Sequence, residues 1–261
     1  MDTDNTVKPR PLRVATIRLR EPGVAFKSAI AWEILGEFAE RYPEYITPDS
    51  DAEKNEFKIL YRDSTGEEQG YALISSTSIG IASRASLSAI EWQECYRFFI
   101  NSVLEKLTIS PLSVVHLDNE MLPSWKTRAH HGRILYELFG EGTGLRQMFS
   151  GMGVYQFSSK GLFMLDRDEH VMCMLSFQSR GPTDVDRLEF YPEPYELSAT
   201  CGVAKTGAFA SKTPLADVVD RILTVSEEAF DSKFIPAVVD PISRLISQIE
   251  RDLPADPEGE G

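Results

Sequence analysis

Cysteine is scarce in this sequence, and long apolar runs are absent. The 261 residues include three cysteines, Cys95, Cys173 and Cys201, which are odd in number and lie far apart. This usage argues against a disulfide framework and favours a reducing compartment, with the three thiols as small buried side chains. No apolar run approaches the ~20 residues that a membrane span needs, and the opening MDTDNTVKPRPLR has no apolar core of a secretory signal. We therefore expect a cytoplasmic protein that does not contact a membrane.

Familiar catalytic motifs are also missing. The sequence contains no G-x-S-x-G, H-E-x-x-H or Cys-x-x-Cys. The glycine-rich segment 140–144 lacks the spacing of a phosphate-binding loop, and the pair Gly202 and Gly207 is followed by Ala208, where a P-loop requires lysine. The sequence thus predicts no catalytic residue, no cofactor and no nucleotide site.

One strand segment offers a possible set of metal ligands. His116, Asp118 and Glu120 alternate along the chain, so they would share one face of a strand. An imidazole and two carboxylates suit a divalent metal, but a tight site would need a bend or further ligands. A solvated strand face is the favoured interpretation, and no metal site is predicted.

Acidic residues outnumber basic ones, and the excess is concentrated in three segments. The chain has 40 acidic and 27 basic residues, giving a formal net charge of −13 at pH 7. Segments 37–68, 182–196 and 250–261 have net charges of −6, −4 and −4, so the remainder is nearly neutral at +1. Such a field disfavours nucleic acid, and we expect no binding to random duplex DNA at about 150 mM salt. The acidic segments are interpreted as solvated loops or tails.

The periodicities predict an α+β protein. Strands in runs with short connections favour antiparallel sheets with helices packed on one face. We expect two lobes, at 12–122 and 148–253, with flexible tails at 1–11 and 254–261. Strands are predicted at 12–19, 57–62, 71–75, 78–84, 112–121, 154–165, 171–179, 187–191 and 197–203, helices at 28–42, 88–107, 213–230 and 240–253, and an acidic loop at 44–56.

The clearest helix begins at residue 88. Ser88 and Glu91 have the spacing of a capping box, and Ser28 is the expected N-cap of the preceding helix. Trp92, Phe99 and Val103 follow on one helical seam, so we expect all three side chains to be buried.

Four short motifs suggest a relationship. One helix ends in Arg41-Tyr42-Pro43, another begins at Glu91-Trp92, the segment Val115–Asn119 ends a strand in asparagine, and EEAFDSKF occupies Glu227–Phe234. Together they resemble a sporadically distributed prokaryotic family of about this length with no established function. The family's strand usually reads Leu-Arg-Tyr-Ile-Asn, whereas this chain has His116-Leu117 in place of Arg-Tyr. The resemblance implies partners encoded nearby, because members often lie beside defence and mobile-element genes, and it supplies no catalytic residues.

A basic segment is the strongest candidate for an interaction site. Residues 124–133 read SWKTRAHHGR and contain no acid, in a chain that is acidic as a whole. We interpret them as a loop in which an exposed tryptophan among cations binds an acidic partner surface or a few phosphates. The alternative is that the tryptophan packs into the core. The predicted partner-binding residues are Trp125, Lys126, Arg128 and Arg133.

These observations favour a protein without catalytic activity. We expect a non-enzymatic protein-interaction or regulatory protein, an accessory component of a prokaryotic defence locus (restriction- or CRISPR-linked), whose partner is another protein encoded nearby. The alternative is a hydrolase with a dispersed active site that is not visible in sequence. A third hypothesis, an acidic nucleic-acid mimic, is weaker because the acidic residues cluster in three segments.

Overall fold

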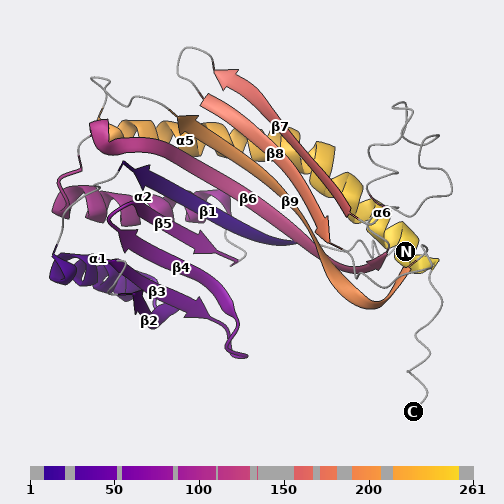
Figure 1. The fold of residues 1–261 in the computed structure, drawn as a ribbon, viewed down its shortest axis with the longest axis horizontal. Coiled ribbons are helices and arrows are strands. Elements are labelled where there is room, and N and C mark those ends of the chain that lie inside the picture. The colour runs from indigo at the N-terminus through magenta and orange to yellow at the C-terminus, as the bar shows by residue number, and fades with distance from the viewer. Residues whose placement is uncertain are drawn as a thin grey trace.

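Within the residues that the structure describes, nine antiparallel strands form one open sheet in the computed structural model (Figure 1). The described residues are 9–20, 27–51, 55–84, 88–109, 111–129, 134, 156–166, 171–180, 190–206 and 214–252. The strand order across the sheet is β2-β3-β4-β5-β1-β6-β9-β8-β7. The strands are β1 Arg10–Leu19, β2 Tyr45–Asp51, β3 Glu56–Arg62, β4 Glu68–Ser75, β5 Ser78–Ser83, β6 Val114–Ala129, β7 Gln156–Asp166, β8 Val171–Arg180 and β9 Phe190–Thr206.

The helices pack on one face of this sheet, as the sequence predicts (Figure 1). α1 lies against β2 and β3, while α5 and α6 lie against β6. None of the described helices combines the length and apolarity needed to cross a membrane. The helical segments are α1 Ser28–Arg41, α2 Ala89–Lys106, the 3-10 turn Pro111–Ser113, α5 Leu215–Ala229, the π-helix η2 Phe230–Val239 and α6 Asp240–Arg251.

The central strand β6 joins strands from both predicted lobes. It pairs with β1 on one side and with β9 on the other. It also runs without a break through position 122, the predicted end of the first lobe. The lobe boundaries themselves stay a prediction, and most of the predicted tails lie outside the described residues.

The core confirms the predicted seam of α2. Trp92, Phe99 and Val103 are fully buried. The Phe99 ring meets Phe38 of α1 edge to face, with 5.3 Å between centroids. The predicted capping box is present as well: the Ser88 hydroxyl accepts the Glu91 amide, and the Glu91 carboxylate accepts the Ser88 amide at 2.8 Å. The backbone of Lys27, not Ser28, occupies the N-cap of α1, so that prediction was wrong.

Three segments predicted as loops or breaks are strands. The expected acidic loop 44–56 contains β2, because Tyr45 is buried and donates its hydroxyl to the Ala82 carbonyl at 2.9 Å. The expected loop 124–133 is strand as far as Ala129. The expected break at Pro192 and Pro194 falls inside β9. The register between β9 and β6 is irregular there, so the strand tolerates prolines, which have no backbone N–H to donate.

The two closing helices are joined, although the sequence predicts a separate start at Asp240-Pro241. The π-helix η2 connects α5 to α6 without interruption. Its residues Phe230, Phe234 and Val239 are buried, so the wider turn keeps its apolar side in the core. Pro236 lies inside it and is exposed.

Candidate interaction cleft

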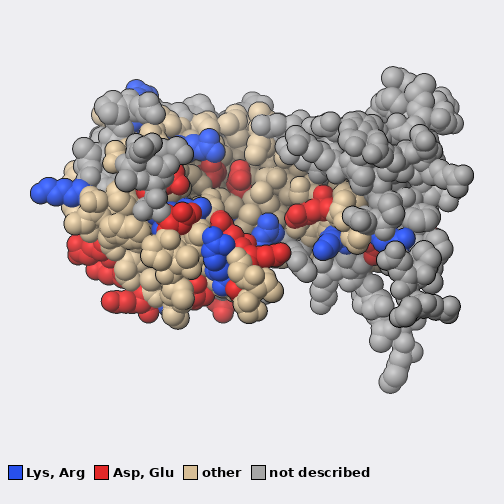
Figure 2. Space-filling model, turned by 60° about the horizontal axis from the view of Figure 1, so that its bottom comes forward, with Lys and Arg blue, Asp and Glu red and all other residues tan. Residues whose placement is uncertain are grey.

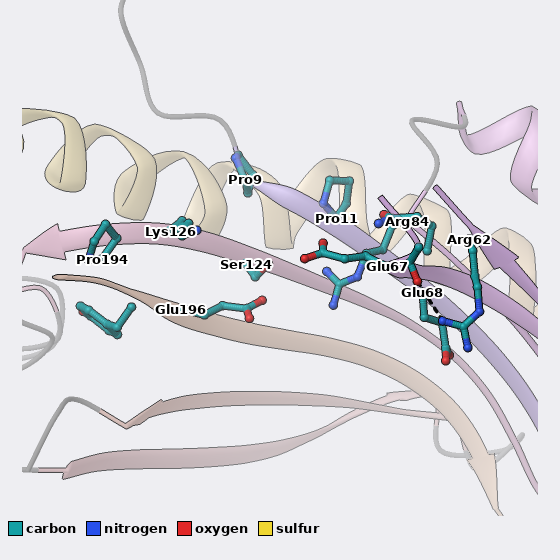
Figure 3. Close-up of a pocket in the computed structure, with 13 residues that line it drawn as sticks. Pro9, Pro11, Arg62, Glu67, Glu68, Arg84, Ser124, Lys126, Pro194 and Glu196 are labelled. Carbon is teal, nitrogen blue, oxygen red and sulfur yellow. Dashed lines mark hydrogen bonds between the residues drawn. The ribbon is translucent and has the colours of Figure 1, made fainter. Parts of the chain in front are cut away.

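A cleft of about 760 Å³ opens on the face of the sheet opposite the helices (Figure 3). In the close-up, Lys126 and Pro194 lie at one end, Arg62 and Glu68 lie at the other, and Ser124 lies between them. The cleft therefore spans the sheet from the β3–β4 hairpin to β6 and β9. Its lining residues are Pro9, Pro11, Arg62, Gly66, Glu67, Glu68, Gln69, Arg84, Ser124, Lys126, Pro194, Tyr195 and Glu196.

The alternation of β6 directs two lining residues into the cleft. Pro123 and Trp125 are buried on the helix side, and the Trp125 indole donates to the Ser243 hydroxyl of α6 at 2.8 Å. Because successive strand residues point to opposite faces, Ser124 and Lys126 project from the other face. Lys126 pairs in register with Glu196 of β9, which brings both chain segments to the cleft floor.

A tight turn positions the opposite end. Asp63 accepts hydrogen bonds from the Thr65 hydroxyl at 2.6 Å, from two backbone amides, and from Gln69 Nε2 at 2.7 Å. The Thr65 hydroxyl bond is the main reason that the pKa of Asp63 lies below its usual value. Gly66 has φ of 85°, a conformation that favours glycine, and its carbonyl accepts Arg62 Nη1 at 2.8 Å. The hairpin is thus held in a defined shape beside the cleft.

Charged side chains of both signs line the cleft, and they form no ion pair within the part of the chain that the structure describes. Six charged side chains line it, and none forms an ion pair with a described residue, whereas elsewhere Lys106 binds both Glu33 and Glu37 at 2.6 Å. Figure 2 shows basic and acidic side chains interspersed near the middle of its view, not separated into one field of each sign. The six are Arg62, Arg84, Lys126, Glu67, Glu68 and Glu196.

The predicted partner-binding residues are divided between the two faces of the sheet. Lys126 is exposed and lines the cleft, and Arg128 is half-buried on the same strand. Trp125 is 1% exposed and faces α6, so the expectation of an exposed tryptophan was wrong and the alternative of a core tryptophan is confirmed. Arg133 lies outside the described residues. Whether Lys126 and Arg128 bind a partner stays a prediction.

Sequence reasoning missed the residues that the β3–β4 hairpin contributes. Arg62, Glu67 and Glu68 are far from Lys126 in sequence. The hairpin itself was predicted, but its position relative to β6 depends on β1, which pairs with both β5 and β6. No local sequence pattern predicts that β1 pairs with these two strands.

A second polar cluster lies on the same open face. His116 Nε2 and Asp118 Oδ2 are 2.8 Å apart, and the Asp118 side chain is nearly buried. Burial is the main reason that the pKa of Tyr71 is raised, and the charges of Asp118, Glu68 and Glu120 raise it further. Tyr71 therefore lies within the electrostatic influence of Asp118 and Glu120. His116, Asp118 and Glu120 thus share a strand face as predicted, but Asp118 is buried, so the expectation of a solvated face was wrong at that position. Among the described residues, no group of three His, Cys, Asp or Glu side chains is arranged to hold a metal ion.

A buried polar network occupies the helix side of β6. Asn119 accepts from Trp92 Nε1 at 3.2 Å and donates to the Ser226 hydroxyl at 2.6 Å. Glu227 accepts from Arg13 at 2.5 Å, and its Oε2 has no hydrogen-bond partner among the described residues. Three of the four motifs that carry the family resemblance, those containing Trp92, Asn119 and Glu227, therefore meet here. The network joins α2, α5, β1 and β6, so these residues have a structural role.

Comparisons with known proteins add little to this geometry. No family model matches the chain, and no curated protein matches it. A solved structure, the di-domain ARO/CYC StfQ from the steffimycin biosynthetic pathway, is 9% identical over 93% of this chain and 99% of that chain, with a TM-score of 0.22. A score at that level supports no argument about fold or function.

Proposed function

We propose that this protein is a non-enzymatic protein-interaction or regulatory protein whose partner binds in the cleft. The observation that carries the proposal is the set of six charged side chains lining it, none of which is ion-paired with a described residue. A charged side chain without a partner remains hydrated in the free protein. An opposite charge on a partner can replace that water and add specificity and association rate.

The lining favours a polypeptide over nucleic acid. A phosphate backbone requires cations, and Glu67, Glu68 and Glu196 would repel it. A folded protein or an extended peptide can instead present both signs of charge, in register with Lys126 and Glu196. The polar lining also differs from the predominantly apolar pockets that hold small ligands.

The biological setting of the proposal comes from the family resemblance. That resemblance implies a prokaryotic defence locus, restriction- or CRISPR-linked, and a partner encoded nearby. In such a locus an accessory protein would act by holding another component, so binding and not turnover is the activity to measure.

The test is a quantitative pull-down with the products of neighbouring genes, co-expressed with charge-reversed variants. Lys126→Glu and Glu196→Lys should each weaken capture of the partner by tenfold or more. Each change places a charge opposite a group of the same sign on the partner. Arg244→Glu is the matched control: it makes the same change in charge as Lys126→Glu, on an exposed position of α6 behind the sheet. Equal capture by all three variants would overturn the assignment of the cleft.

A hydrolase remains the second candidate, and the His116–Asp118 pair is the observation that favours it. A carboxylate that orients an imidazole is the usual arrangement of a general base. The experiment is a screen of ester, amide and phosphoester substrates with the purified protein and with His116→Ala. Hydrolysis by the parent protein that disappears in His116→Ala would favour this candidate over the interaction proposal, whereas equal rates would exclude His116 as its base.

A further inference from the structure

Two of the three cysteines lie in contact although they are 28 positions apart in the sequence. Cys173 is on β8 and Cys201 is on β9, and their Sγ atoms are 3.7 Å apart. The register pairs Cys173 with Val203, and Leu175 with Cys201, so the two cysteines are diagonal neighbours on adjacent strands. Both thiols are free.

We propose that Cys173 and Cys201 are a redox-modification site, oxidised by hydroperoxides to an intramolecular disulfide. A disulfide needs an Sγ–Sγ distance of about 2.05 Å, so the atoms must approach by about 1.7 Å. Because the two thiols already face one another, side-chain rotation and a small shift of β8 supply this movement. Reversible disulfides of this kind are typical of redox-sensing proteins in reducing compartments.

Cys173 is the thiol that reacts first. It keeps 8% of its surface exposed, against 1% for Cys201, so a small oxidant reaches it sooner. The hydrogen bond with Cys201, followed by the charge of Lys233 on η2, lowers the pKa of Cys173, whereas the same hydrogen bond raises the pKa of Cys201. A thiolate is the nucleophile in this chemistry, so the asymmetry favours attack by Cys173.

The chemistry balances with a hydroperoxide as the oxidant. The Cys173 thiolate attacks the O–O bond and takes one oxygen as a sulfenic acid, and the other oxygen leaves and is protonated to water or an alcohol. The Cys201 thiol then attacks the sulfenic sulfur, the S–S bond forms, and the hydroxyl leaves as water with the thiol proton. Two electrons pass from the two thiols to the peroxide.

The disulfide would connect the outer hairpin to the sheet covalently. β7 and β8 form that hairpin, and among the described strands β8 is attached to the rest of the sheet only through β9. Hydrogen exchange of β8 amides should therefore slow in the oxidised protein.

The third cysteine provides an internal control. Cys95 on α2 is as buried as Cys201, and burial raises its pKa to about 12. No other thiol of a described residue contacts Cys95, and its pKa is not lowered. Cys95 should therefore stay reduced when the pair is oxidised.

The experiment is peroxide titration of the native protein, followed by blocking of free thiols, proteolysis and mass spectrometry. We expect a linked Cys173–Cys201 peptide, a loss of two hydrogens per chain, reversal by dithiothreitol, and Cys95 recovered as a free thiol. Cys95→Ser should retain the linkage, while Cys201→Ser should accumulate a sulfenic acid at Cys173 that dimedone traps.

Mass-spectrometric identification of the oxidised cysteines in the protein without substitutions tests the proposal even if a serine variant folds poorly. Oxidation of Cys95 before Cys173, or no linked peptide at a peroxide concentration that oxidises exposed methionine, would overturn it. Dimedone labelling of Cys201 in place of Cys173 would overturn the order of reaction.

Discussion

The two sides of strand β6 hold polar side chains in opposite ways. On the helix side, Asn119 bonds Ser226 of α5, and Thr127 bonds Glu250 of α6 at 2.6 Å. On the open side, Asp118 is paired with His116 of its own strand, and Lys126 has no ion-pair partner among the described residues. A polar group enclosed between sheet and helix has no water to bond, so it needs a protein partner. At exposed positions of the open side, such as Lys126, water or a binding partner can serve instead, which separates residues that stabilise the fold from residues available for recognition.

The largest test of this contrast concerns the helix side, through Phe99. Phe99→Ala should lower the free energy of unfolding by about 3–5 kcal/mol, because a fully buried ring leaves a cavity beside Phe38. Ile90 of the same helix is 68% exposed, so Ile90→Ala should change stability by less than about 0.5 kcal/mol. Urea unfolding of both variants measures the difference. Similar values for the two would contradict the placement of α2.

Asn119 should be the next most costly position. Asn119→Ala should destabilise by about 2–3 kcal/mol, because the Trp92 N–H is left buried without an acceptor. Lys126→Ala, on the open side of the same strand, should cost less than about 0.5 kcal/mol. If thermal melts give equal losses for the two variants, the two sides of β6 do not differ as described.

Neighbouring residues of β6 allow a finer test. Trp125→Phe keeps an aromatic ring but removes the hydrogen bond to Ser243, so we expect a loss of about 1–2 kcal/mol. In Trp125→Phe, partner capture should fall only as far as the folded fraction falls. In Lys126→Glu, capture should fall while the melting temperature is unchanged. A Trp125→Phe protein that melts normally and no longer binds would restore the tryptophan to the interaction surface.

The smallest effect is a pH dependence on the open side. Burial, then the charges of Asp118, Glu68 and Glu120, raise the pKa of Tyr71 above its ordinary 10.0. The unfolded chain therefore ionises this tyrosine first, so its contribution to stability is present below pH 10 and is lost as pH rises through the folded pKa. Asp118→Asn should lower the pKa of Tyr71, as followed by phenolate absorbance. An unchanged titration would show that Asp118 does not face Tyr71.

Local signals predicted the elements whose determinants lie close together in the sequence. The Ser88–Glu91 capping box and the seam through Trp92 and Phe99 each occupy a few turns of one helix, so periodicity was sufficient. β2 was missed because acidic, proline-containing sequence disfavours strands, and its stability comes from pairing with β3. The same reason applies to the end of β6: residues 124–129 look like a basic loop until β9 pairs with them.

The candidate site was predictable only in part. Lys126 was identified because a basic run is unusual in an acidic chain, but its neighbour Trp125 was placed on the wrong side. Alternation predicts that the two point in opposite directions once the segment is known to be a strand. With the segment taken as a loop, that constraint was absent.

Composition and periodicity alone were enough to establish the α+β class, the antiparallel hairpins, the seam of α2 and the shared face of His116 and Asp118, since these depend on residues a few positions apart. Packing of distant segments had to establish which side of β6 the helices cover, how Arg62 and Lys126 come to line one cleft, and how Cys173 meets Cys201. An alternating strand defines two faces equally well, and nothing in the alternation says which one will be buried. That choice is made by contacts across long stretches of chain, when the amphipathic faces of α5 and α6 find the side of the sheet that buries the most apolar surface.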